Sequence, residues 1–226
     1  YKRQATMDVS TLFDTVRQVL DDVRINGDAA IRKYEKQFDK VDLTDLLVSE
    51  EEIAEAESLV SEDLKQAIRT AKENIETFHV SQRFEGKKIQ TAPGVVCWQK
   101  AVPIEKVGLY VPGGCKEIVL CTPPSKTGKI HPAILFAAKV AGVNKICKVG
   151  GSQAIAAMAY GTESIPKVYK IFGPGNQYVT AAKQWVSLKE VAIDMPAGPS
   201  EVEVIADEFA NPDFIAADFL TSRTWS

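Results

Sequence analysis

The chain has 226 residues, of which 45% are hydrophobic and 25% charged, and its formal net charge is −3. These values are ordinary for a globular protein with a sizeable core, and the slightly acidic balance argues against a basic surface for nucleic acids or anionic membranes. We therefore expect the partner to be a small neutral or anionic metabolite. The four cysteines have no metal-ligand spacing and are expected to be reduced core residues: Cys97, Cys115, Cys121 and Cys147.

The apolar runs of the sequence are too short for a membrane span. Each is interrupted by Lys, Pro or Gly well before the roughly 18 residues that a span requires. No charged segment followed by an apolar one opens the chain at Tyr1. We therefore expect a cytoplasmic protein, unless a transit segment was removed ahead of Tyr1.

The first 85 residues are predicted to form an N-terminal helical arm. Apolar residues recur at helical spacing up to Gly27, which is a plausible stop, and Asp28 is placed to cap a second helix. Ser49 and Glu52 form a capping box ahead of a third helix, and Ser61 precedes a longer amphipathic one. An arm of this kind is expected to act as a scaffold or as a dimer contact.

From residue 86 onward, short β-rich runs alternate with helical segments. Strands are expected at residues 95–99, 107–111, 118–121, 146–149, 168–172 and 202–206. Pro132 and the pair Asn211-Pro212 mark two helix starts. The alternation predicts right-handed crossovers and hence an α/β fold, with a mainly parallel sheet, flanking helices and incomplete Rossmann-like units. In such sheets, ligands bind outside the carboxyl ends of the strands.

Two glycine loops directly follow expected strands and lead into expected helices. They read Gly150-Gly151-Ser152-Gln153 and Gly173-Pro174-Gly175-Asn176. Bare backbone at a helix N-terminus favours phosphate or carboxylate. Neither loop is a GxGxxG fingerprint, however, and tight strand-to-helix turns alone would also require glycines. The amides of Gln153 and Asn176 favour the ligand interpretation, because both can bond a nicotinamide, ribose or phosphate group.

Two further side chains are candidates for ligand contact. Tyr110 ends a strand beside a third glycine turn, where its ring either stacks on a flat ligand or fills a half-buried place in the strand. Ser200 follows Pro196 and Pro199, which fix the backbone, and it either faces a substrate or serves as a turn or N-cap residue. Residues 125–129 lack the first glycine of a phosphate loop, and His79 and His131 lack metal or triad partners.

Five motifs in the right order resemble the histidinol dehydrogenase family. They are residues 107–114, 149–157, 160–168, 172–176 and 193–201, and the similarity extends into the arm through residues 26–30 and 78–79. The resemblance implies a zinc-dependent homodimer that oxidises L-histidinol through L-histidinal to L-histidine, the last steps of histidine biosynthesis, and reduces two NAD. It also implies that NAD contacts Tyr110, Gln153 and Asn176, and that Ser200 contacts histidinol.

The sequence departs from the family pattern at three places. A strand-and-helix-sized segment is absent between Gly114 and Cys115, and Ser222 and Trp225 stand where the family has a zinc-binding Gln and His. The region with the catalytic Glu-His pair and the other zinc ligands is also missing. The resemblance therefore assigns no catalytic residue and no metal ligand to this chain.

We expect two parts: a helical arm over residues 1–85 and an α/β dinucleotide-binding region over residues 86–226. The departures indicate that the second part is incomplete, with gaps at 114/115 and near 220/221. Two other functions remain open. One is a truncated or inactive dinucleotide-binding module that lacks the zinc site and serves assembly. The other is a phosphosugar-binding α/β protein that uses the glycine loops for phosphate.

Overall fold

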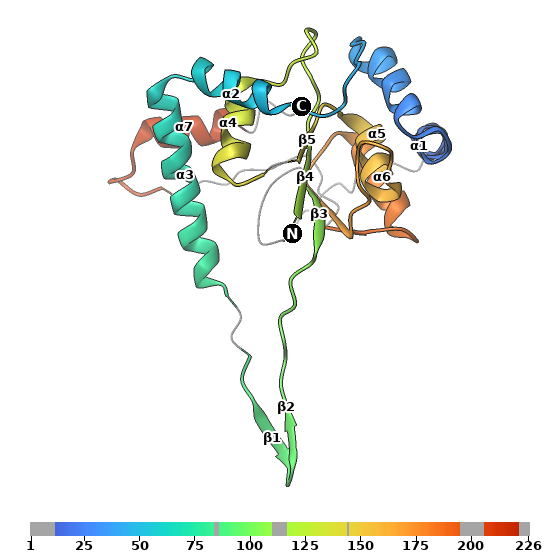
Figure 1. Cartoon of the computed structure of the whole chain (residues 1–226). Helices are drawn as coiled ribbons and strands as arrows, with labels where there is room; N and C mark the ends of the chain where they lie inside the picture. The colour runs from blue at the N-terminus through green and yellow to red at the C-terminus, as the bar shows by residue number, and fades with distance from the viewer. Residues whose placement is uncertain (1–11, 84–85, 110–116, 144, 195–205, 222–226) are drawn as a thin grey trace.

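The computed structural model describes residues 12–83, 86–109, 117–143, 145–194 and 206–221. Within these ranges a five-stranded sheet lies between two layers of helices (Figure 1). Its strands are β3 (Lys106–Leu109), β4 (Glu117–Cys121), β5 (Lys145–Cys147), β6 (Lys170–Phe172) and β7 (Ala192–Ile193). Their order is β5-β4-β3-β6-β7 and every neighbouring pair is parallel. The predicted α/β fold is confirmed.

Three strands differ from expectation, because no strand was predicted at residues 89–92 either. The run at residues 95–99 is β2 (Val95–Cys97), which pairs antiparallel with β1 (Ile89–Ala92) as a hairpin outside the main sheet. The hairpin forms because Pro93 and Gly94 make a two-residue turn and Gly94 has φ of 81°. β7 was not predicted, since a two-residue strand leaves almost no pattern. The strand expected at 202–206 lies largely outside the described residues.

One face of the sheet is covered by α1 (Phe13–Tyr34), α5 (Gly151–Tyr160) and α6 (Gln177–Ser187). The two helices expected on either side of residue 27 form one element that is kinked at Gly27, which has φ of 51°. The kink is held from the segment after α5, because the backbone N–H of Asp28 donates to Glu163 Oε2 at 2.8 Å and Ser164 hydrogen-bonds the Asp28 carboxylate.

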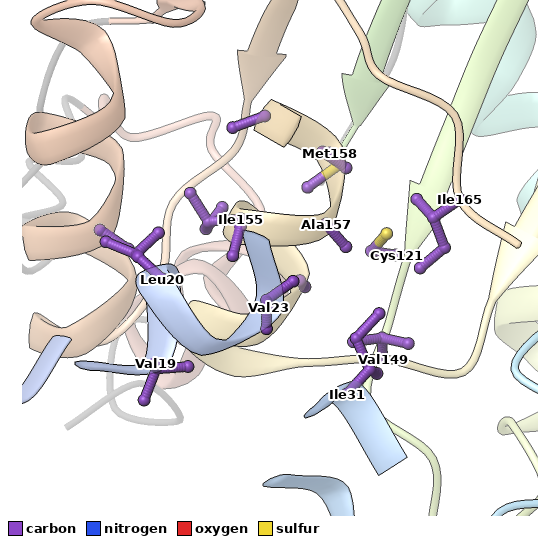
Figure 2. Close-up of a cluster of buried hydrophobic side chains, with 14 of the residues drawn as sticks. Val19, Leu20, Val23, Ile31, Cys121, Val149, Ile155, Ala157, Met158 and Ile165 are labelled. Carbon is purple, nitrogen blue, oxygen red and sulfur yellow. The ribbon is translucent and has the colours of Figure 1, made fainter. Parts of the chain in front are cut away.

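The main core lies between this helical layer and the sheet. Figure 2 shows apolar side chains of α1 facing those of α5 and of the strands. The residues labelled there are Val19, Leu20, Val23, Ile31, Cys121, Val149, Ile155, Ala157, Met158 and Ile165. Since α1 contributes to the same core as the sheet, the helical arm is folded onto the α/β part. The domain division at residues 85/86 stays a prediction.

The opposite face of the sheet carries α2 (Glu50–Leu59), α3 (Glu62–Ser81) and α4 (Pro132–Val140). The capping box of Ser49 and Glu52 and the cap at Ser61 are confirmed. A smaller core lies beneath α2 and α4 and comprises Ala56, Ile130, Leu135, Ala138, Val143 and Ile146. The final helix, α7 (Pro212–Thr221), is capped as predicted, because Asn211 Oδ1 accepts from the N–H of Asp213 at 2.9 Å.

The sheet edge at β5 is covered by the chain ahead of α2. Lys148 N–H donates to the Leu46 carbonyl at 2.7 Å, and Val48 N–H donates to the Ile146 carbonyl at 2.9 Å. An edge strand that is paired in this way offers no free ladder to another chain. The first third of the sequence thus packs on both faces and one edge of the sheet.

The hairpin and the lower part of α3 extend away from the sheet (Figure 1). We call α3, β1 and β2 together the projecting arm. No residue of α3 is buried. The large apolar side chains exposed on the projecting arm are Leu64, Ile75, Phe78, Val80, Ile89, Val95 and Val96. The expectation of a core cysteine is wrong for Cys97, which lies exposed on the hairpin, whereas Cys121 and Cys147 are buried free thiols; Cys115 lies outside the described residues. None of the helices in the described ranges is long and apolar enough to cross a membrane.

Candidate functional site

The order of the strands places a reversal of winding beside the central strand β3. The chain runs from β3 outward through β4 to β5, and then crosses back through α5 to β6 on the other side of β3. The direction of winding therefore reverses between β3 and β6, which is the place where ligands bind in open parallel sheets. Both glycine loops lie at this edge, because each directly follows a parallel strand. β5 and β6 are three strand spacings apart, roughly 14 Å.

The first loop turns from β5 into α5 through two glycines with steric reasons to be glycine. A Cβ on Gly150 would come within 2.7 Å of Pro123 Cβ, and Gly151 has φ of +58°. The turn itself therefore requires these residues, as the simpler interpretation held. Gly150 is the N-cap of α5 and provides no side-chain cap. Free N–H groups in the first turn of a helix attract anions, so the start of α5 is suited to a phosphate.

Gln153 supports this loop from below. Its side chain is only 1% exposed, and its Nε2 donates to Glu35 Oε1 at 2.9 Å and to Asp39 Oδ2 at 3.5 Å. The N–H of Gly150 donates to the same Glu35 Oε1 at 3.2 Å. Contact between Gln153 and a ligand stays a prediction. What the geometry adds is a carboxylate that links the glycine turn to the first turn of α5.

Glu35 was not among the residues predicted from the sequence. It belongs to η2 (Glu35–Asp39), a single π-helical turn at the end of α1, and it lies 118 positions before Gln153. Its position four residues after buried Ile31 places it on the core-facing side of the helix, which was the one available signal. Single π turns are frequent at functional sites.

The electrostatics of this cluster are unusual. The pKa of Glu35 is raised to about 7, chiefly by burial; the neighbouring Asp39 carboxylate acts in the same direction, while hydrogen bonds from Gln153 and Gly150 act in the opposite direction. Burial also raises the pKa of Asp39. The charge beneath the start of α5 therefore changes near neutral pH.

The second loop leads into α6 and is capped by Asn176. The Oδ1 of Asn176 accepts from the N–H groups of Tyr178 at 3.0 Å and Val179 at 3.1 Å. The cap itself uses the amide oxygen, and the side chain is exposed. The NH₂ group of Asn176 can therefore donate to a ligand at this edge while the oxygen keeps the helix capped.

A buried ion pair holds the start of this second loop. Lys183, which is 5% exposed, donates to the Gly173 carbonyl at 2.6 Å and pairs with Asp194, whose Oδ2 accepts from the Gly173 N–H at 2.8 Å. Asp194 directly follows β7 and precedes the segment that carries Ser200. The pair thus fastens the loop after β6 to the end of β7. A lysine inside an amphipathic helix gave no sequence signal for this role.

Two predicted site residues, Tyr110 and Ser200, lie outside the described residues. His131 has a structural part, because its Nδ1 accepts from the N–H of Ala133 at 3.2 Å and caps α4. Across the described ranges, no three His, Cys, Asp or Glu side chains converge in a way that could hold a metal ion.

A parallel sheet with helices on both faces, glycine turns at its carboxyl edge and a reversal of winding beside its central strand defines a doubly wound α/β protein. The sequence profile of the histidinol dehydrogenase family matches residues 2–223. The chain belongs to the histidinol dehydrogenase family, and hence to a family of oxidoreductases.

Individual relatives agree with this assignment. The chain is 63% identical to histidinol dehydrogenase of Bacteroides thetaiotaomicron over 238 residues, which cover 97% of this chain and 56% of the relative. It is 50% identical to the Escherichia coli enzyme over 228 residues, covering 92% of the chain and 52% of the relative. The crystal structure of histidinol dehydrogenase from Elizabethkingia anophelis superposes with a TM-score of 0.86 at 50% identity, and covers 97% of this chain and 54% of that one. The chain spans about half the length of these relatives.

Proposed function

We propose that this protein oxidises L-histidinol through L-histidinal to L-histidine with NAD as the oxidant, and that the chain described here supplies the NAD loops and one substrate contact. Family membership supports the reaction. The observation that carries the cofactor assignment is the position of the two glycine turns, which lead into α5 and α6 from strands on either side of the point where the winding reverses. Bound NAD would accept the hydride that leaves the substrate.

Each candidate residue has a separate part in this proposal. The N–H groups at the start of α5 would bind the phosphates of the dinucleotide, helped by the helix dipole. Asn176 would donate its NH₂ group to the cofactor, and Tyr110 and Gln153 would contact it as the family resemblance implies. Ser200, on the segment after β7, would contact histidinol. None of these residues exchanges a proton with the substrate in this scheme.

Zinc does not fit the described residues, because they offer no set of three converging ligands. The family's zinc ligands would therefore come from residues outside the described ranges, and we assign no step through the metal to this chain. The principal alternative function is a dinucleotide-binding module that lacks the zinc site. The position of the glycine turns supports this module equally, and oxidation of histidinol distinguishes the enzyme from it.

The connection from β3 to β4 supports a missing segment. These strands are parallel neighbours, yet only residues 110–116 lie between them, whereas parallel neighbours are normally joined by a dozen or more residues. The match to the Bacteroides relative also runs over 238 residues, more than the 226 of this chain. We propose that the complete polypeptide carries a longer connection after Gly114. A purified polypeptide with a mass well above 24.7 kDa would support this.

We also propose that the protein is a homodimer in which the projecting arm contacts the second copy. Large apolar side chains exposed along the projecting arm are unusual for an isolated monomer. Light scattering should give twice the mass of the purified polypeptide, and a monomer mass would contradict the proposal.

The activity is tested with the protein as purified from its host. Two NADH should form for each L-histidinol consumed, because conversion of an alcohol to a carboxylate removes four electrons, and a zinc chelator should abolish the reaction. Binding of NAD without oxidation of histidinol would instead support the inactive module. Binding of a sugar phosphate without NAD binding would support the third function.

Asn176→Asp separates cofactor binding from helix capping. Aspartate retains the oxygen that caps α6, but it removes the NH₂ donors and places a negative charge near the dinucleotide phosphates. We expect the Kd for NAD to rise by about tenfold or more, which corresponds to ~1.4 kcal/mol, with the unfolding midpoint unchanged. Asn211→Asp, the same change at the cap of α7, should alter neither quantity. An unchanged Kd in Asn176→Asp would remove Asn176 from the site.

A further inference from the structure

A buried cluster of acceptor oxygens lies directly beneath the start of α5. Glu35 is 0% exposed, and the π turn of η2 brings both its carboxyl group and that of Asp39 toward Gln153. Two buried side-chain oxygens in the cluster have no hydrogen-bond partner among the described residues, namely Glu35 Oε2 and Gln153 Oε1. An unpaired buried acceptor is destabilising, so the cluster requires an explanation.

A proton on Glu35 resolves this imbalance. The available donors are Gln153 Nε2 and the N–H of Gly150, and both already point at Glu35 Oε1. When Glu35 is protonated, its second oxygen becomes a donor and can bond a neighbouring acceptor, either Asp39 or Gln153 Oε1. Loss of that proton leaves two carboxylates and an amide oxygen together in the core, where their mutual repulsion is poorly screened. Protonation therefore relieves the repulsion within the cluster, while Oε1 remains the acceptor for Gly150 and Gln153.

We propose that Glu35 is a positioning residue for the dinucleotide site, whose carboxyl group fixes Gly150 and Gln153 at the start of α5 and whose proton, shared with Asp39, favours binding of the dinucleotide's phosphates. This inference rests on the proposed function. A neutral Glu35 adds no negative charge beneath the positive end of the helix dipole, whereas an ionised Glu35 weakens that end and repels the charge of the phosphates. Cofactor binding is thereby linked to pH.

The surroundings of Glu35 support a transition near neutral pH. Among the described residues, the titratable groups that interact with it are Asp39 on η2 and Cys121 at the end of β4. The buried Cys121 has its pKa raised well above the ordinary value by Cys147 and by burial, so it remains a neutral thiol at physiological pH. Asp39 and the burial of Glu35 both act to retain the proton. Affinity for NAD should then fall as the pH rises through about 7.

Three variants of the full-length protein test this inference. Glu35→Ala removes the acceptor of two hydrogen bonds, and we expect it to raise both the Kd and the KM for NAD by about tenfold, while the KM for histidinol changes by less than twofold. Glu35→Gln keeps an oxygen for Gly150 and Gln153 and supplies NH₂ donors to the unpaired acceptors. It should recover most of the affinity and abolish the change of Kd between pH 6 and pH 8.

The matched control is Glu163→Ala. Glu163 also accepts a backbone N–H across the fold, but it lies beyond the other end of α5 and is expected to leave the Kd for NAD unchanged. An unchanged Kd in folded Glu35→Ala, or an unchanged pH dependence in Glu35→Gln, would overturn the inference. If Glu35→Ala fails to fold, the pH dependence in Glu35→Gln decides alone. Absence of NAD binding by the wild-type protein would overturn the proposed function instead.

Discussion

Replacing Lys183 by Met is expected to lower the free energy of unfolding by about 3–5 kcal/mol, because removal of one partner from a buried ion pair leaves the other charge uncompensated. Lys183 has a side chain that is 6% exposed, and it is paired with Asp194. The substitution also removes the donor to the Gly173 carbonyl. Urea denaturation of the variant and the wild-type protein would measure the difference.

Two further variants make this result interpretable. Lys139→Met removes a lysine from a half-exposed pair with Glu57, where Nζ and Oε2 are 2.6 Å apart, and it should cost less than about 1 kcal/mol. Adding Asp194→Asn to Lys183→Met removes the stranded charge and keeps an acceptor for the Gly173 N–H, so the double variant should be more stable than the single one. Equal losses at Lys183 and Lys139 would contradict a buried structural pair.

The second large effect concerns the pH dependence of stability. The pKa of Glu35 is raised in the folded protein from the ordinary 4.5 to about 7, mainly by burial. The folded state therefore holds a proton that the unfolded state has lost, and stability from this group decreases as the pH rises from about 4.5 to about 7. A shift of this size corresponds to a loss on the order of 3 kcal/mol.

Glu35→Gln should remove that loss. An amide does not ionise, and its NH₂ group can donate to Asp39 or to Gln153 Oε1. We expect the variant to be less sensitive to pH than the wild-type protein between pH 5 and pH 7, and more stable than it at pH 8. The difference between the two unfolding curves isolates this group, since the other titrating residues are common to both. A variant that is less stable than the wild type at pH 8 would show that Glu35 is held as a charged group.

Much of the local structure follows from short sequence patterns. The capping box at Ser49, the caps at Ser61 and Asn211 and the start of α4 at Pro132 were predicted, because each depends on contacts within one turn of the chain. The alternation of strand and helix predicted a parallel sheet, because a helix between two strands carries the chain back to the end of the sheet where the next strand begins. The order of motifs along the chain was also enough to indicate the family.

Two other features of the fold were not predicted from the sequence. The kink at Gly27 joins two expected helices into one element, because Glu163 and Ser164 hold the chain there from the far end of α5. The β1–β2 hairpin lies apart from the parallel sheet, since the turn at Pro93 and Gly94 reverses the chain directly. The contacts that decide the kink join residues 135 and 136 positions apart, which no short sequence pattern shows.

The sequence by itself determined where the glycine turns lie, which residues start the helices after them, and which family the chain resembles, because these properties are carried by residues close together along the chain. Only the tertiary structure decided that Glu35 and Asp39 lie beneath Gln153, and that Lys183 and Asp194 clamp Gly173. Glu35 and Gln153 are 118 positions apart and meet only because α1 packs on α5 across the main core. Burial in that core gives Glu35 its altered pKa, and burial is a property of the packed fold that no short stretch of sequence contains.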